Sequence, residues 1–231
     1  MPSSDKGLLA TVAGPAGSAL SAVSAGLGRL RPAEKPLHPC GIALDATVRR
    51  AGSPERFGVP WLDEPGIDSA LVRFSRGAGL PSALPDLLGL ALRVDPAGHP
   101  GDLLFVTAGR GPLSRFITVP RRSPVISFTT YSTLQPYRTV SGPVMLSATP
   151  IAGDAGLGER LGVRLAAARP TGRWHDFAFV TVAVPPGAEE DRTVSFDPFR
   201  HELPGLENYP LARRLREGAY AAARRSRRPR R

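Results

Sequence analysis

Apolar and polar residues alternate along much of the chain between residues 41 and 184, as in half-buried β-strands. The clearest case is the segment 42–48, where Ile42, Leu44 and Val48 alternate with smaller or more polar residues. Short apolar runs bounded by Gly, Pro or Asp predict further strands at Leu71–Ser75, Leu88–Val94, Asp102–Thr107, Val144–Ala148, Leu161–Ala167 and Phe177–Val184. A turn at residues 170–172 and short connections elsewhere then predict a single antiparallel barrel of about eight strands.

The two ends of the chain have helical patterns. Apolar residues between Leu8 and Leu30 recur mostly at spacings of three and four, which predicts an amphipathic N-terminal arm over 1–34. A second helix is predicted from Tyr209, with an apolar stripe on one side and arginines on the other. We therefore expect an α+β fold in three parts: the arm 1–34, a barrel domain with its C-terminal helix over 35–227, and a basic tail over 228–231.

The formal net charge of +10 is concentrated at the C-terminus, where nine arginines and one glutamate between Arg213 and Arg231 account for +8. The sequence pI near 11.0 therefore describes the tail rather than the barrel. Six of the eight residues from Arg224 to Arg231 are arginine. Such a tail attracts nucleic acid or anionic lipid without recognising sequence, or is simply a solubilising end.

The cysteine content and the N-terminal composition bear on location. A single cysteine, Cys40, excludes an internal disulfide framework and a cysteine-rich zinc module, and it fits a reducing compartment. The uncharged stretch 7–28 is rich in Gly, Ala and Ser, so it resembles neither a signal peptide nor a transmembrane helix. We expect a cytoplasmic protein without a transmembrane segment. The preference for arginine over lysine and the abundant Ala, Gly and Pro indicate a GC-rich bacterial genome.

Tyr220 is centred in a file of arginines on one face of the predicted C-terminal helix. Because a phenol has a pKa near 10, a tyrosinate at neutral pH needs nearby positive charge or a metal. Arg216, one turn earlier, is placed to hydrogen-bond a phenolate, and the face also carries Arg213, Arg224 and Arg227. From spacing alone, a solvated basic helix with an incidental tyrosine is the favoured interpretation, because basic C-terminal faces are common.

Three separated segments change this picture. The first is Leu37-His38-Pro39-Cys40-Gly41, and the third is Arg216-x-x-x-Tyr220 with Arg227 seven residues after the tyrosine. Between them lie Leu71-Val72-Arg73-Phe74-Ser75, Asp86-x-x-Gly89-x-Ala91 and Asp102-Leu103-Leu104. In order and spacing they resemble the haem-dependent catalase-like family in its short, actinobacterial-type form, over roughly residues 36–228.

This resemblance implies an eight-strand antiparallel barrel that binds haem. Tyr220 would be the metal ligand on the iron, and Arg216 would keep it ionised. Arg73 and Arg227 would pair with the haem propionates.

The resemblance also implies two catalytic residues. His38 would transfer a proton between the two oxygens of a peroxide, and Ser75 would hydrogen-bond the far ring nitrogen of that histidine. Catalases carry an asparagine in the segment corresponding to 105–108, and this chain has none. In addition, Lys35 replaces an arginine before the histidine, and Ala222-Ala223 replaces an Asp-Thr pair.

These departures favour a haem-binding protein with weak peroxidase activity, or one that transforms organic hydroperoxides, over a rapid catalase. A non-catalytic haem carrier and a polyanion-binding module remain alternatives, and a homo-oligomer is compatible with the sequence. Short relatives are also labelled phosphodiesterases, although the sequence holds no Asp and His cluster for a two-metal site.

The other titratable side chains carry less information. His38-Pro39-Cys40 lacks a second ligand pair for zinc. His175-Asp176 is interpreted as a surface or rim pair, and His99 and His201 are assigned to loops without a function.

Overall fold

The structure is a computed structural model of the 231-residue chain, and it describes residues 41–77, 84–121, 129–151, 160–185 and 194–214. The predicted N-terminal arm lies outside the described residues, as do four of the predicted site residues: His38, Arg216, Tyr220 and Arg227. Arg73 and Ser75 lie within them. No helix in these ranges has both the length and the apolar character needed to span a bilayer.

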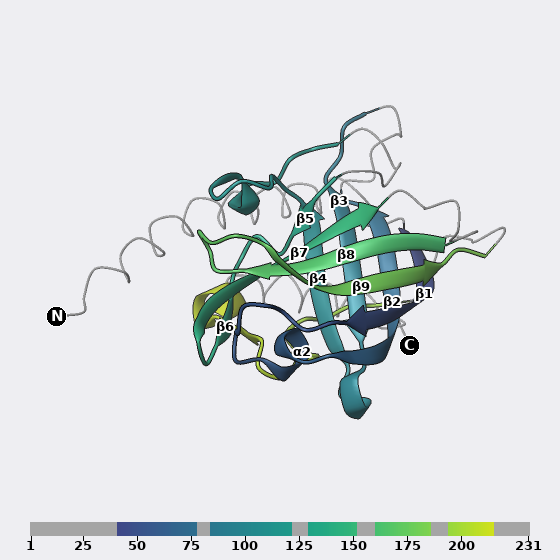
Figure 1. The fold of residues 1–231 in the computed structure, drawn as a ribbon. Coiled ribbons are helices and arrows are strands. Elements are labelled where there is room, and N and C mark those ends of the chain that lie inside the picture. Colours follow the sequence, from purple (N-terminus) through teal and green to yellow (C-terminus); the bar gives the residue numbers. More distant parts are fainter. Residues whose placement is uncertain (1–40, 78–83, 122–128, 152–159, 186–193, 215–231) are drawn as a thin grey trace, which may run out of the picture.

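The described chain is mostly β-structure (Figure 1). Its strands are β1 (Gly41–Arg50), β2 (Gly66–Arg76), β3 (Leu88–Val94), β4 (Gly101–Thr107), β5 (Tyr131–Ser132), β6 (Tyr137–Thr139), β7 (Gly142–Ile151), β8 (Arg160–Ala168), β9 (His175–Ala183) and β10 (Glu207–Asn208). Helical structure within the same ranges includes α2 (Pro60–Asp63) and two 3₁₀ turns, η1 (Pro96–Gly98) and η2 (Ser114–Phe116). A further helix begins at Pro210 and continues to the end of the described residues at Arg214.

The sheet closes on itself. Its strand order is β10-β6-β7-β5-β4-β3-β2-β1-β9-β8, and β7 also pairs with β8. Eight strands, from β7 through β1 to β8, therefore form a closed ring, and β6 and β10 extend the sheet beyond β7. All the pairings are antiparallel. The predicted antiparallel eight-strand barrel is confirmed.

Alternation along each strand fills the barrel interior. On β1 and β2 the inward side chains include Leu44, Val48 and Val72, and Leu90 on β3 pairs with Phe105 on β4 inside the same core. The residues between them face outward. Because one slip in register would exchange the two faces, the buried set fixes which residues lie outside.

The predicted strand positions agree with the structure, and Leu88–Val94 agrees at both ends. Strands β1, β2, β7 and β8 extend beyond the apolar runs that predicted them. The predicted turn is also present, because the Gly172 N–H donates to the Arg169 carbonyl oxygen at 2.9 Å. The pattern missed β5, β6 and β10, because two or three residues are too few to show a period.

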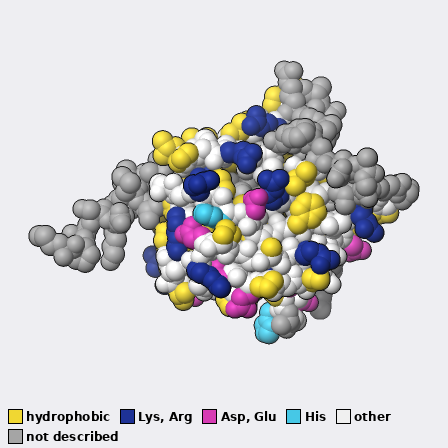
Figure 2. Space-filling model, viewed as in Figure 1, with side chains coloured by type: hydrophobic (Ala, Val, Ile, Leu, Met, Phe, Trp, Pro, Cys, Tyr) yellow, Lys and Arg dark blue, Asp and Glu magenta, His cyan; other side chains and the backbone are white. Residues whose placement is uncertain are grey.

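The surface over β8 and β9 mixes side chains of all kinds. Figure 2 shows arginines spread among apolar and acidic side chains on this face, rather than gathered in one basic patch. The structure therefore gives this view of the barrel no strong polyanion surface.

Candidate functional site

The first four strands present a continuous face on the outside of the barrel. The registers of β1 to β4 align its side chains in two rows, one made of Gly41, Ser75, Gly89 and Val106 and the other of Ala43, Arg73, Ala91 and Leu104. We call these eight residues the outer face. Glycine and alanine fill half of its positions, so much of it consists of backbone and short side chains. Arg73 and Ser75 carry its only polar side chains.

Arg73 lies almost entirely out of solvent, with 6% of its surface exposed. Its guanidinium covers Gly41 on the neighbouring strand. A Cβ atom added to Gly41 would lie 2.7 Å from Arg73 Cζ and Nη2 and 2.5 Å from the Phe74 carbonyl oxygen. Glycine at position 41 therefore makes the space in which the arginine lies.

Ser75 is directly opposite Gly41 in the β1–β2 pairing. Its hydroxyl donates to the carbonyl oxygen of Gly89, which is its partner on β3, at 3.5 Å. His38 precedes Gly41 by three residues but is not among the described residues, so its predicted hydrogen bond with Ser75 is not tested. The structure does bring together Arg73, Ser75 and the strand that follows His38.

The segment that lacks the catalase asparagine is β4. Phe105 and Thr107 are buried toward the barrel interior, and Val106 between them belongs to the outer face. In the row that contains Ser75, β4 therefore contributes the isopropyl group of Val106 and no side-chain amide. A ligand on the outer face would meet apolar surface there.

Two described tyrosines have pKa values shifted away from a tyrosinate. Burial raises the pKa of Tyr131 to about 12, and burial also raises the pKa of Tyr209 despite the nearby charge of Arg138. Both shifts favour the neutral phenol.

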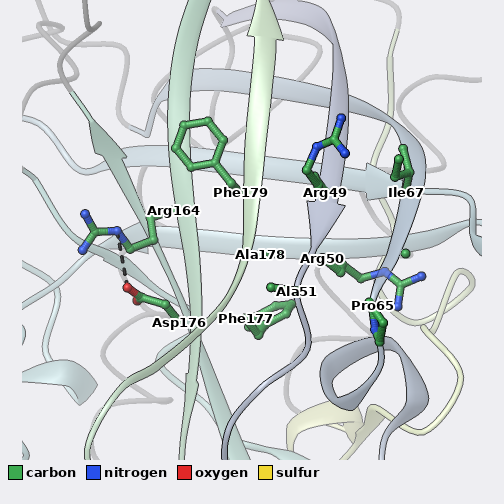
Figure 3. Close-up of a pocket in the computed structure, with 11 residues that line it drawn as sticks. Arg49, Arg50, Ala51, Pro65, Ile67, Arg164, Asp176, Phe177, Ala178 and Phe179 are labelled. Carbon is green, nitrogen blue, oxygen red and sulfur yellow. Dashed lines mark ion pairs between the residues drawn. The ribbon is translucent and has the colours of Figure 1, made fainter.

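A separate cavity of about 610 Å³ opens elsewhere, against β1, β8 and β9 (Figure 3). Phe179 lies between Arg164 and Asp176 on one side and Arg49 and Ile67 on the other. Neither Arg73 nor Ser75, the two predicted site residues that the structure describes, lines it. Arg164 pairs with Asp176 at 3.5 Å, an exposed pair that contributes little energy. Throughout the described ranges, no three His, Cys, Asp or Glu residues are grouped as a metal site.

One polar cluster was missed by sequence reasoning. His201, assigned no function from its loop position, lies 3.0 Å by its Nδ1 from Oδ2 of Asp102, and Arg93 forms an ion pair with the same carboxylate. Arg93 and Asp102 face each other across the β3–β4 hairpin. Arg93 and Asp102 are equally far in sequence from the turn between β3 and β4, so their pairing could have been predicted. Nothing in the neighbouring sequence indicated that His201 would join them.

Comparison with solved structures identifies the architecture. The chain superimposes on the crystal structure of a fungal catalase with a TM-score of 0.60, at 13% identity over 88% of this chain and 61% of that one. It matches catalase A from Saccharomyces cerevisiae with the same TM-score, at 11% identity over 87% of this chain and 62% of that one.

The chain has the catalase fold. It spans about three-fifths of the length of these catalases. No protein-family model matches it, and no curated protein sequence matches it at a significant level. At identities this low the similarity identifies the fold alone, so activity must be argued from the residues.

Proposed function

We propose that this chain binds haem against the outer face and acts on peroxides as a slow peroxidase or a hydroperoxide-transforming enzyme. The observation that carries the proposal is the outer face itself. On a barrel of catalase fold, Arg73 and Ser75 lie side by side on a surface of small residues, next to the strand that follows His38. A flat macrocycle with anionic substituents needs such a surface and such a cation.

The residues present fit haem in two ways. Glycine and alanine at positions 43, 89 and 91 place only short side chains or backbone where a planar group would approach the sheet. Arg73 offers a fork of donors that matches a carboxylate, and it is held in place by burial. Haem would supply redox-active iron for peroxide chemistry when bound.

We assign the iron ligand to Tyr220 and its activation to Arg216, which keeps the phenol ionised by positive charge one turn away. Arg227 would bind a second propionate beside the one bound by Arg73. Arg213, although in the same file of arginines, is committed elsewhere: its Nη2 donates to Glu202 Oε1 at 2.9 Å, and its guanidinium lies over the Phe199 ring.

We assign the proton chemistry to His38. A neutral imidazole would take the proton from one oxygen of a peroxide and return it to the other oxygen, which would assist cleavage of the bond between the two oxygens. Ser75 would fix the tautomer by its hydroxyl. The segment that corresponds to the catalase asparagine presents Val106 and no amide on the outer face. An organic hydroperoxide is therefore favoured over hydrogen peroxide, because its alkyl group would find apolar surface.

We further propose that the domain covers residues 35–227 of the sequence, preceded by the arm 1–34 and followed by the tail 228–231. The basic tail is the observation that favours a second activity, a salt-sensitive contact with polyanions. That contact would be independent of haem.

The central experiment is Tyr220→Phe. Phenylalanine keeps the ring and removes only the oxygen, so the protein should stay folded and lose most of its haem, together with its Soret band. Hemin titration of protein expressed without haem precursor measures the affinity directly.

Tyr209→Phe is the matched control, because it removes a phenol near the start of the same predicted helix and should leave the Soret band unchanged. An unaltered band in Tyr220→Phe would overturn the assignment of the iron ligand. A wild-type chain that binds no hemin would overturn the proposed function as a whole.

A further inference from the structure

A buried carboxylate joins the barrel to the segment that follows it. Asp102 on β4 has 1% of its surface exposed, although both of its oxygens are charged acceptors. Arg93 donates to it twice, from Nε to Oδ1 at 2.6 Å and from Nη2 to Oδ2 at 2.8 Å. The backbone N–H of Asp197 donates to Oδ2 at 2.6 Å, and His201 Nδ1 lies 3.0 Å from that oxygen.

The same two barrel residues hold the backbone of residues 194–209, which we call the C-terminal strap. The Asp102 N–H donates to the His201 carbonyl oxygen at 2.8 Å, and Arg93 Nη2 donates to the Ser195 carbonyl oxygen at 2.7 Å. The Arg93 guanidinium also lies over the Phe196 ring, 5.0 Å from its centroid. The strap is thus hydrogen-bonded to the barrel at both ends of one short stretch, residues 195–201.

This attachment borders the outer face. Asp102 and Arg93 pair across β3 and β4, and Leu104 and Ala91 pair two residues further along the same strands, on the same side of the sheet. Two residues of strand correspond to about 7 Å. The strap therefore crosses the barrel immediately beside the row that contains Arg73.

The strap is also tied to the helix that follows it. Glu202 Oε1 accepts from Asn208 Nδ2 and from Arg213 Nη2, both at 2.9 Å, and Asn208 Nδ2 donates to the Pro198 carbonyl oxygen at 2.9 Å. Arg213 belongs to the first turn of that helix. A displacement at residues 195–201 would be transmitted through Glu202 to the start of the helix.

We propose that Asp102 is a positioning residue for ligand binding on the outer face: it fixes the strap, and through it the first turn of the C-terminal helix, against β3 and β4. This rests on the proposed haem function, because the helix matters to the site only if it carries the iron ligand. Hydrogen bonding to Asp102 raises the pKa of Arg93, so the guanidinium side of this contact stays charged.

The test compares two buried carboxylates of the barrel. Asp102→Asn is matched by Asp68→Asn, because Asp68 has 6% of its surface exposed and accepts from Arg50 Nε at 2.8 Å and Trp61 Nε1 at 3.0 Å. Asp68 lies five residues from Arg73, the nearest outer-face residue on β2, which is about 17 Å. Both variants should lower the unfolding temperature, since each leaves a partly buried arginine without its carboxylate.

Only Asp102→Asn should weaken hemin binding, by about tenfold or more, with a displaced or broadened Soret band. Asp102→Glu, which keeps a carboxylate for Arg93, should recover part of the affinity. His201→Ala removes one contact of the strap and serves as the milder variant if Asp102→Asn does not fold. The proposal would be overturned if folded Asp102→Asn bound hemin as tightly as Asp68→Asn. If Asp102→Asn does not fold, the same comparison is made between His201→Ala and Asp68→Asn.

Hydrogen exchange without haem separates this proposal from the function on which it rests. Asp102→Asn should raise amide exchange in residues 195–213 and leave β1 and β2 protected, whereas Asp68→Asn should not affect the strap. Increased strap exchange in a chain that binds no hemin would refute the haem function and retain the attachment. Unchanged strap exchange would refute the positioning role itself.

Discussion

Arg73 depends on a residue of another strand for its place. Gly41 leaves the space that the guanidinium occupies, and any larger residue would contact Arg73 or the Phe74 carbonyl oxygen. Sequence resemblance predicted Arg73 as an anion-binding residue, and the structure adds why the arginine can be buried beside a backbone. Gly41 belongs to a different segment of the resemblance, residues 37–41, and only the structure shows that this glycine makes the space for the arginine.

At the same scale, His38 separates an enzyme from a carrier. His38→Ala should retain haem, because Tyr220 would supply the bond to iron. Its reaction with an organic hydroperoxide should slow by about a hundredfold, which is the usual contribution of a positioned proton-transfer group. Stopped-flow spectra of the wild type and the variant measure this rate.

Ser75→Ala is the companion variant and should slow the reaction less, because it would disturb only the orientation of the imidazole. Equal rates for wild type and His38→Ala with both hydrogen peroxide and a fatty-acid hydroperoxide would exclude the catalytic assignment.

The sequence could predict candidate site residues that share one local motif, and it missed a contact that depends on the fold. Arg73 and Ser75 belong to one five-residue motif, so a single resemblance predicted both as site residues. His201 lies 99 residues from Asp102, and only the closed barrel with its strap brings the two side chains together. No periodicity along one strand encodes such a contact.

Among the strands that form the closed ring, β5 is the shortest. It has two residues, Tyr131 and Ser132, and it bridges β4 and β7. Pattern analysis could not detect it, yet Tyr131 is among the largest fully buried side chains and belongs to the central core. Burial of this one ring thus compensates for the few backbone hydrogen bonds of the strand.

This burial predicts how stability depends on alkaline pH. The pKa of Tyr131 is raised from 10.0 to about 12, so the folded state disfavours the phenolate. The stabilisation from the neutral ring is complete below pH 10 and is lost as the pH rises toward 12. Denaturant midpoints measured from pH 8 to pH 12 should fall in this window.

Tyr131→Phe has no such proton to lose, so its midpoint should fall less over the same range. A parallel fall in both proteins would show that another group controls alkaline unfolding. Absorbance at 295 nm gives an independent measure, because Tyr131 and Tyr209 both have raised pKa values and Tyr131→Phe removes one of these two late-titrating phenols.

For the whole molecule, the positive charge is concentrated in the C-terminal tail rather than in the barrel. This predicts that polyanion binding and haem binding can be separated. Residues 228–231 lie beyond Arg227, which is the last residue matched to the haem motif, and removing them deletes three arginines. Hemin affinity should be unchanged, and retention on a heparin column should decrease in a salt-dependent manner.

A full-length variant with glutamine at positions 228, 230 and 231 controls for chain length and should behave like the truncation. Loss of haem from the truncated chain would show that the haem domain extends past residue 227.

The closed ring has a consequence for how the chain reaches its native state. Strands β1 to β4 pair in sequence order, so the outer face can assemble from neighbouring hairpins as one sheet. Closure is different, because it joins residues 46–50 of β1 to residues 178–182 of β9. Such distant pairing must await most of the chain and lowers the folding rate, since the entropy of closing the loop is lost before contacts form. During synthesis, the half of the barrel that bears Arg73 and Ser75 would emerge and pair long before the ring that buries its other side is complete.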